Sequence, residues 1–174
     1  MPENAQQYVD RILRNLDRDS LAIQSTTQQK LARLTENVPA VELKRRTSSD
    51  QWSVAEIVAH LTDAEIVTSY RIRKILSESG SSISAYDQNL WEANLNYQVR
   101  DPVQDVKYFG VLRDMNLALL RDLTDEQWER FGMHEERGRE SLRHLARLVA
   151  GHDVNHLKQI EAILKTPRSN SFAA

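Results

Sequence analysis

The sequence predicts an all-α protein built as a bundle of four amphipathic helices. Apolar residues recur at helical spacing in four long segments, and no segment alternates convincingly between apolar and polar residues as a strand would. Only five glycines and four prolines occur among 174 residues, as expected of a helical protein with few sharp turns. Because isolated helices of this length are marginal in water, the four apolar faces are expected to pack against one another.

The first two predicted helices cover residues 5–36 and 53–76. The stretch LDRDS, residues 16–20, weakens the apolar stripe of the first helix and is a place where it could kink. Ser53 and Glu56 form a capping box at the start of the second helix. We prefer this role for Glu56 over a catalytic one.

The other two predicted helices follow a long connection. The third begins after Asp101, with proline in its first turn, and runs to Leu123. A short extra turn is expected over residues 124–130, and the fourth helix begins at Ser141 and continues to Ile163.

The connection over residues 77–101 is expected to be a functional loop. It is far longer than the usual ~4 to 6 residues, and it contains the aromatic residues Tyr86, Trp91 and Tyr97. Residues 1–166 are expected to form a single domain, and residues 167–174, with little to bury, a disordered tail.

Composition and charge exclude several classes of function. Lys and Arg total 23 and Asp and Glu 25, so a formal net charge of −2 provides no broad cationic surface for nucleic acid. No run approaches the ~20 apolar residues of a membrane span, and the first residues do not resemble a signal peptide, which predicts a cytoplasmic protein without a membrane partner. Because cysteine is absent, any metal must be held by histidine, carboxylate or water.

Three of the five histidines fall on apolar helix faces. His152 and His156 lie four residues apart on the fourth helix, and His60 lies on the apolar side of the second. An H-x-x-x-H pair is by itself also compatible with two core histidines held by hydrogen bonds. Three imidazoles in one interior would, however, cost much desolvation free energy unless a shared cation compensated it.

Three segments resemble the DinB-like superfamily, most closely its YfiT branch of bacillithiol transferases and metal-dependent hydrolases. They are QWSVAEIVAHLTDAE from Gln51, AYDQNLWEAN in the long connection, and LVAGHDVNHLKQIEAIL near the end. The resemblance implies an up-down-down-up four-helix bundle, a metal bound by His60, His152 and His156, and a homodimer.

A site of three histidines without an evident fourth protein ligand has the composition of a catalytic metal centre. Its open position would accept water or substrate. An all-imidazole ligand set favours zinc or nickel without excluding iron or manganese.

Asp63 and Gln159 are the candidates for orienting the histidine ligands. Asp63 lies three residues after His60, and Gln159 three residues after His156, so each is on the side of its histidine. The alternative for both is a solvated surface position or a hydrogen bond between helices.

Four further residues are candidates for contacting the substrate. Tyr86, Asp87 and Trp91 match the tyrosine-acid-x-x-x-tryptophan pattern of the superfamily, which implies a segment that folds over the metal. The alternative is that Tyr86 and Trp91 only anchor the connection to the bundle. Arg71 lies close to the apolar stripe of its helix and could contact an acidic substrate.

The function expected from these observations is that of a metal-dependent enzyme acting on a small molecule. The resemblance favours thiol S-transfer of the bacillithiol type, with a low-molecular-weight thiol as cosubstrate and a metal-bound thiol or water as the reacting group. The alternatives are a metal-dependent hydrolase and a non-enzymatic dimeric stress protein that binds a metal or small ligand. Space beside the metal would favour catalysis.

Overall fold

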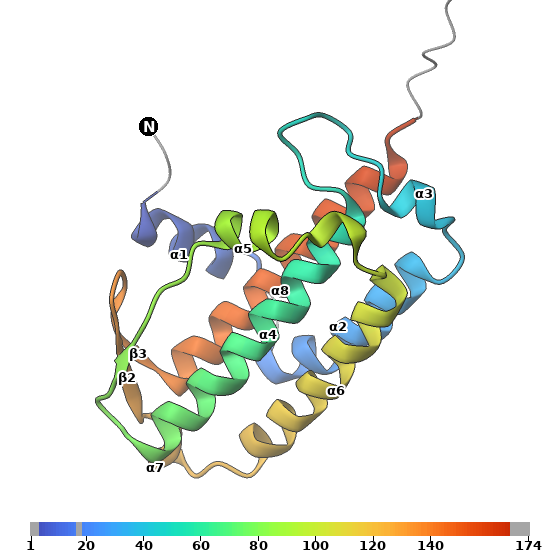
Figure 1. Ribbon diagram of the computed structural model, residues 1–174. Coiled ribbons are helices and arrows are strands. Elements are labelled where there is room, and N and C mark those ends of the chain that lie inside the picture. Colours follow the sequence, from blue (N-terminus) through green and yellow to red (C-terminus); the bar gives the residue numbers. More distant parts are fainter. Residues whose placement is uncertain (1–3, 17–18, 168–174) are drawn as a thin grey trace, which may run out of the picture.

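The computed structural model describes residues 4–16 and 19–167 (Figure 1). Apart from Pro167, the expected disordered tail lies outside the described residues. Within those ranges, no helix combines the length and the apolar character needed to cross a membrane.

Four long helices form the body of the protein. They are α2 (Ser20–Thr35), α4 (Val54–Ser77), α6 (Pro102–Arg121) and α8 (Leu142–Lys165). In Figure 1, α2 and α8 run in one direction and α4 and α6 in the other. This confirms the predicted up-down-down-up bundle.

The helix starts follow the capping residues in the sequence. The Ser53 side chain accepts a hydrogen bond from the Glu56 backbone, and the Glu56 carboxylate accepts one from the Ser53 backbone at 2.7 Å, which confirms the capping box. The carboxylate of Asp101 caps α6, which has proline in its first turn. Ser141 caps α8 in the same way.

The first segment differs from its prediction, because residues 5–36 form two helices instead of one. A short helix, α1 (Ala5–Leu13), precedes α2, and the Asp19 side chain caps α2 by accepting from the Leu21 and Ala22 backbones. Helix α1 packs against α8 at Gly151, where a Cβ atom would lie 2.4 Å from the Ile12 carbonyl oxygen. A glycine beside His152 therefore permits this close approach.

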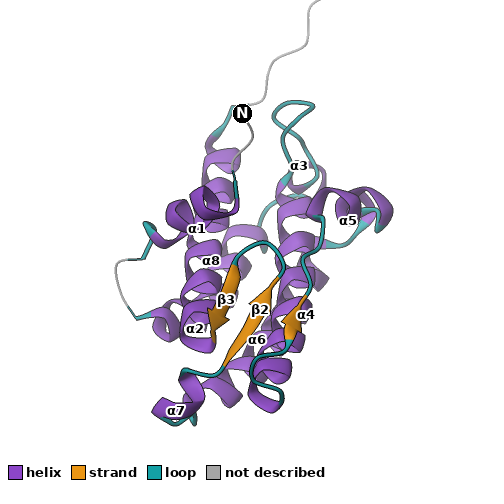
Figure 2. Ribbon diagram, turned by 90° about the vertical axis from the view of Figure 1, so that its left-hand side faces the viewer, coloured by secondary structure: helices purple, strands orange, loops and turns teal. Residues whose placement is uncertain are grey.

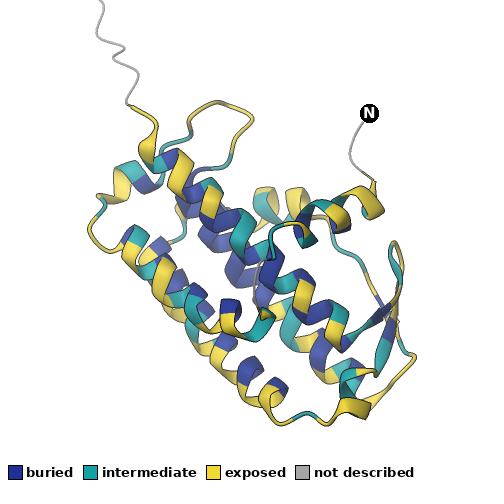
Figure 3. Ribbon diagram, turned by 180° about the vertical axis from the view of Figure 1, so that it is seen from behind, coloured by how far each residue is buried: buried dark blue, intermediate teal, exposed yellow. Residues whose placement is uncertain are grey.

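The core lies between the inward faces of the helices, where buried positions gather in Figure 3. One cluster occupies the end of the bundle at which α4 begins, and includes Leu31, Ile57, Leu61, Phe109 and Ile160. A second occupies the opposite end and includes Ile72, Ile75, Ile83, Leu120, Leu142 and Leu145.

A small three-stranded sheet, which no alternating pattern in the sequence predicted, packs against α4 and α8 near this second end. Its strands are β1 (Ser82–Ile83), β2 (Phe131–His134) and β3 (Gly138–Ser141), in the order β1-β2-β3 (Figure 2). β1 pairs with β2 in parallel, and β2 with β3 antiparallel. Strands of two to four residues are too short to show an alternating pattern.

Two further short helices lie in the connections between bundle helices. The predicted turn over residues 124–130 is confirmed as α7 (Asp125–Trp128), and an additional helix, α3 (Ala40–Leu43), lies between α2 and α4. Both connect bundle helices.

The connection over residues 77–101 is structured along much of its length. Besides β1 it contains α5 (Gln88–Asn94) and a 3₁₀ helix, η1 (Tyr97–Val99). Tyr97 is buried against α4, and Arg100 forms ion pairs with Asp63 at 2.9 Å and with Asp105 at 2.7 Å. These contacts hold the connection against α4 and α6.

Candidate metal centre

Helices α4 and α8 bring three histidine side chains together inside the bundle. Nε2 of His152 lies 3.0 Å from Nε2 of His60 and 3.1 Å from Nε2 of His156. One nitrogen from each ring lies within 4.8 Å of the other two. Since nitrogen ligands of one zinc ion, at about 2.0–2.1 Å from it, are themselves roughly 3 Å apart, the cluster has the dimensions of a single metal site.

The local structure explains this convergence. α4 and α8 run antiparallel, and the early turns of α4 that carry His60 lie beside the middle of α8 (Figure 1). His152 and His156 are one helical turn apart and therefore project from the same face. His60 and His156 are buried, whereas His152 is partly accessible.

Burial keeps all three rings neutral near pH 7. It lowers the pKa of His60 to about 3, with His156 adding to the effect, and lowers the pKa of His156 to about 4. Burial and the other two histidines hold the pKa of His152 well below its usual value. Neutral imidazole is the form that binds a metal.

The side chain of Gln159 fixes the orientation of one histidine. Its Oε1 lies 3.0 Å from Nδ1 of His156. Because an amide oxygen is an acceptor, the ring proton is on Nδ1, and the lone pair on Nε2 points toward the other histidines. The donor set therefore fits a divalent metal ion, and Gln159 lies where a residue orienting that ligand is expected.

The structure gives Asp63 a different role from the one expected. Its two carboxylate oxygens accept hydrogen bonds from the Tyr97 hydroxyl and from Nη1 of Arg100, each at 2.9 Å, and none from His60. A largely buried carboxylate is best stabilised by a cation, and Arg100 supplies one. Asp63 thus anchors the connection beside the histidines.

A cavity of about 750 Å³ adjoins the histidine cluster. His60 and His152 line it, together with three of the four expected substrate contacts, Arg71, Tyr86 and Asp87. Space for a small molecule is therefore present beside the histidines.

The fourth expected contact, Trp91, is not among the residues that line the cavity. Its ring packs against that of Tyr86, with 4.6 Å between the centroids. This contact joins two residues of the connection itself. Asp87 also caps α5, because its Oδ1 accepts from the Asn89 and Leu90 backbones.

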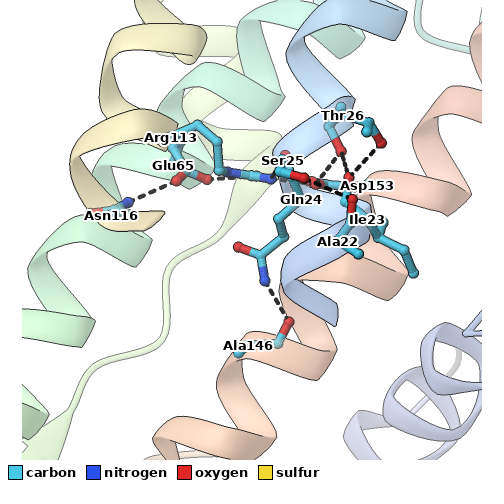
Figure 4. A network of polar contacts seen from close by, with 11 residues as sticks. Ala22, Ile23, Gln24, Ser25, Thr26, Glu65, Arg113, Asn116, Ala146 and Asp153 are labelled. Atoms are coloured by element: carbon cyan, nitrogen blue, oxygen red, sulfur yellow. Dashed lines mark hydrogen bonds and ion pairs between the residues drawn. The ribbon is translucent and has the colours of Figure 1, made fainter. Parts of the chain in front are cut away.

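A buried ionic network, which the sequence pattern did not predict, forms part of the cavity wall. Arg113 pairs with Glu65 at 2.8 Å and with Asp153 at 2.5 Å, and all three side chains are buried (Figure 4). Asn116 donates to Glu65 at 2.7 Å, and Thr27 to Asp153 at 2.8 Å. The network joins all four bundle helices.

Comparison with known proteins identifies the family. Residues 24–160 match the DinB superfamily. The chain belongs to the DinB superfamily. This assignment covers most of the bundle and all three histidines of the cluster.

Relatives of this DinB superfamily protein carry names that refer to metal. Over 118 residues, 67% of each chain, it is 27% identical to a "putative metal-dependent hydrolase" of Oceanobacillus iheyensis. Over 85 residues, it is 31% identical to "Putative metal-dependent hydrolase YfiT" of Bacillus subtilis, covering 49% of this chain and 48% of the relative.

A solved structure shares the fold. It is described as "YfiT from Bacillus subtilis is a probable metal-dependent hydrolase with an unusual four-helix bundle topology". The TM-score is 0.78 at 22% sequence identity, and the match covers 92% of this chain and 87% of that one.

Proposed function

We propose that this DinB superfamily protein is a metal-dependent enzyme that transfers a low-molecular-weight thiol, of the bacillithiol type, to a small electrophile. The observation that carries the proposal is the convergence of three neutral imidazoles, His60, His152 and His156, beside a cavity of about 750 Å³. A protein that used the metal only to stabilise its bundle would not need this space.

The three histidines would hold the metal, with zinc or nickel as the best matches to an all-imidazole site. When bound, such an ion offers an open position and lowers the pKa of a thiol or water that occupies it. Gln159 keeps the His156 lone pair directed into the site. His60 and His156 are buried, which limits the access of bulk water to these two ligands.

The carboxylates around the cavity favour thiol transfer over hydrolysis. Metal-dependent hydrolysis commonly uses a carboxylate as general base. Glu65 and Asp153 are paired with Arg113, and Asp87 caps α5. The fourth carboxylate that lines the cavity, Glu136, is exposed on the turn between β2 and β3. A thiol deprotonated at the site needs no such base.

The proposed reaction is a substitution. The thiol sulfur forms a bond to the electrophilic carbon of the second substrate, the leaving group departs with the bonding electron pair, and the thiol proton is released. Hydrolysis, in which water takes the place of the thiol, is the second candidate. The names of the two relatives favour it.

An assay with both kinds of substrate separates the two reactions. The zinc-loaded and nickel-loaded proteins are incubated with monochlorobimane and a panel of thiols that includes bacillithiol, and in parallel with aryl esters without thiol. Thiol-dependent conjugation that His60→Ala abolishes supports the proposal. His144→Ala removes a histidine of α8 outside the cluster and serves as the control. Ester hydrolysis alone, lost in His60→Ala, would replace transferase with hydrolase.

A further inference from the structure

A buried arginine without a carboxylate partner lines the cavity. Arg71 is 8% exposed, and its Nη2 donates to the Ser84 carbonyl oxygen at 2.7 Å. Within residues 4–16 and 19–167, its Nε and Nη1 have no hydrogen-bond acceptor and its guanidinium forms no ion pair. The other buried arginine, Arg113, has two carboxylates. Glu140 and Glu136 attract the charge of Arg71 without forming an ion pair with it, so an anionic ligand in the cavity would supply the direct partner that a buried charge normally has.

A second hydrogen-bond donor points at the same guanidinium. Burial, together with Arg137 and Arg71, lowers the pKa of His134 to about 4, so its ring is neutral at pH 7. The Glu136 backbone N–H donates to Nδ1 of His134 at 3.2 Å, which leaves the ring proton on Nε2. Nε2 lies 3.3 Å from Nη2 of Arg71. Two donors thus face each other, and an acceptor that both could reach would relieve the mismatch.

Two neighbouring side chains that also line the cavity make the surroundings of Arg71 more suitable for an anion. The Tyr86 ring lies 6.0 Å from Cζ of Arg71, and its hydroxyl has no hydrogen-bond partner in the described part of the chain. The Nε and Nη2 groups of Arg137 donate hydrogen bonds to the Glu140 carboxylate, at 3.0 and 3.2 Å. Glu136 is exposed and forms no ion pair with Arg71 in the same residues.

We propose that Arg71 and the Nε2–H of His134, with Tyr86 beside them, bind an anionic group of the substrate, a carboxylate or a phosphate. This inference rests on the proposed function and adds a second contact point to it. Arg71 lies eleven residues after His60 on α4, three helical turns away on the same face and about 16 Å along the axis. The substrate is therefore elongated, with its reacting group at the histidines and its anionic group at Arg71.

Cobalt-substituted protein allows both contacts to be measured without catalysis. A thiol that binds cobalt produces an absorption band, which is titrated with a series of ω-mercaptocarboxylates and with the matching ω-mercaptoalcohols. At the chain length that spans the cavity, we expect the acid to bind at least about tenfold more tightly than the alcohol, as a charge-assisted hydrogen bond would give. The alcohols are expected to show no such optimum.

Substitutions assign the preference to Arg71. Arg71→Met should reduce the affinity for the acid about tenfold and leave that for the alcohol unchanged. Arg71→Lys, which keeps the charge, should retain part of the preference. Arg73→Met removes a positive charge from an exposed position two residues along α4. It should change neither the affinity for the acid nor the affinity for the alcohol. Circular dichroism checks that the variants remain folded.

The outcomes separate this inference from the proposed function. Equal affinity of wild type for acid and alcohol at every length, or an equal loss of both in Arg71→Met, would overturn the anion site alone. If no thiol alters the cobalt spectrum, the proposed thiol chemistry fails. Calorimetric titration of the same protein with octanoate and octanol then tests whether Arg71 binds an anion. Arg71-dependent binding of octanoate would then support it, and its absence would overturn it.

Discussion

The amide oxygen of Gln159 lies 3.0 Å from Nδ1 of His156, one helical turn away, and determines which ring nitrogen faces the other histidines. Without this acceptor the neutral ring could carry its proton on Nε2, which would block metal binding. One hydrogen bond on the outer side of the cluster therefore prepares a ligand on its inner side.

Replacing Gln159 should weaken metal binding without removing a ligand. Gln159→Leu is expected to lower zinc affinity about 10- to 100-fold, measured by competition with a chromophoric chelator, because His156 loses its orienting acceptor. Glu161→Gln changes an exposed residue two positions further along α8 and should have no effect. Unchanged affinity in Gln159→Leu would remove this role from Gln159.

Breaking the buried ionic network should destabilise the bundle. Arg113→Met leaves Glu65 and Asp153 buried without their cation and is expected to lower the free energy of unfolding by about 3–5 kcal/mol, measured by urea denaturation. Arg143→Met removes an exposed ion pair with Glu129, which solvent screens, and should change the free energy of unfolding far less. Similar losses in the two variants would mean that the network contributes little.

The lowered pKa of His134 predicts a loss of stability in acid. In the folded protein the ring stays neutral down to its pKa of about 4, whereas in the unfolded chain it binds a proton below its usual pKa of 6.5. Stability contributed by this residue is therefore full above pH 6.5 and decreases as the pH falls toward 4.

The His134→Gln variant tests this pH dependence. Its melting temperature should fall less between pH 7 and pH 5 than that of wild type, with both proteins measured in the presence of a chelator. An equal fall in the two proteins would show that His134 titrates alike in the folded and unfolded states.

A stripe of exposed apolar side chains on α6 is our candidate for the interface of the expected homodimer. Tyr108, Val111, Met115 and Leu119 recur at helical spacing on this helix and are exposed. Light scattering is expected to give the mass of a dimer for wild type and of a monomer for Val111→Glu. Val99→Glu, at an exposed apolar position on η1, is the control. A monomeric wild type at all concentrations would exclude the homodimer.

The long helices were predictable from the sequence because their signals are local, whereas their up-down-down-up arrangement was implied by the family resemblance. Ser53 with Glu56 and Asp101 with Pro102 mark helix starts through contacts within one turn, and the structure uses both. The sheet depends instead on pairing Ile83 with His134, about fifty residues apart, and no local pattern predicts such a pairing. The break between α1 and α2 lies where the apolar stripe weakens. The sequence pattern indicated a kink in one helix at this place, and the structure has two helices.

The candidate site was predictable where apolar neighbours indicated burial. His60 lies among apolar residues of α4, and so do His152 and His156 on α8. The pairing of Arg113 with Glu65 and Asp153 was not predicted, because it joins residues that are far apart in the sequence and lie on three different helices. The burial of Arg113 was predictable, because this residue follows Val106 and Phe109 at the spacing of the core-facing side of α6.

Metal analysis of protein purified without an affinity-metal column tests the central claim, that His60, His152 and His156 hold one metal ion. Wild type and His144→Ala should contain about one equivalent of zinc or nickel per chain, and His60→Ala and His156→Ala should contain almost none. Equally low metal content in all four folded proteins, even after incubation with zinc and with nickel, would contradict the claim.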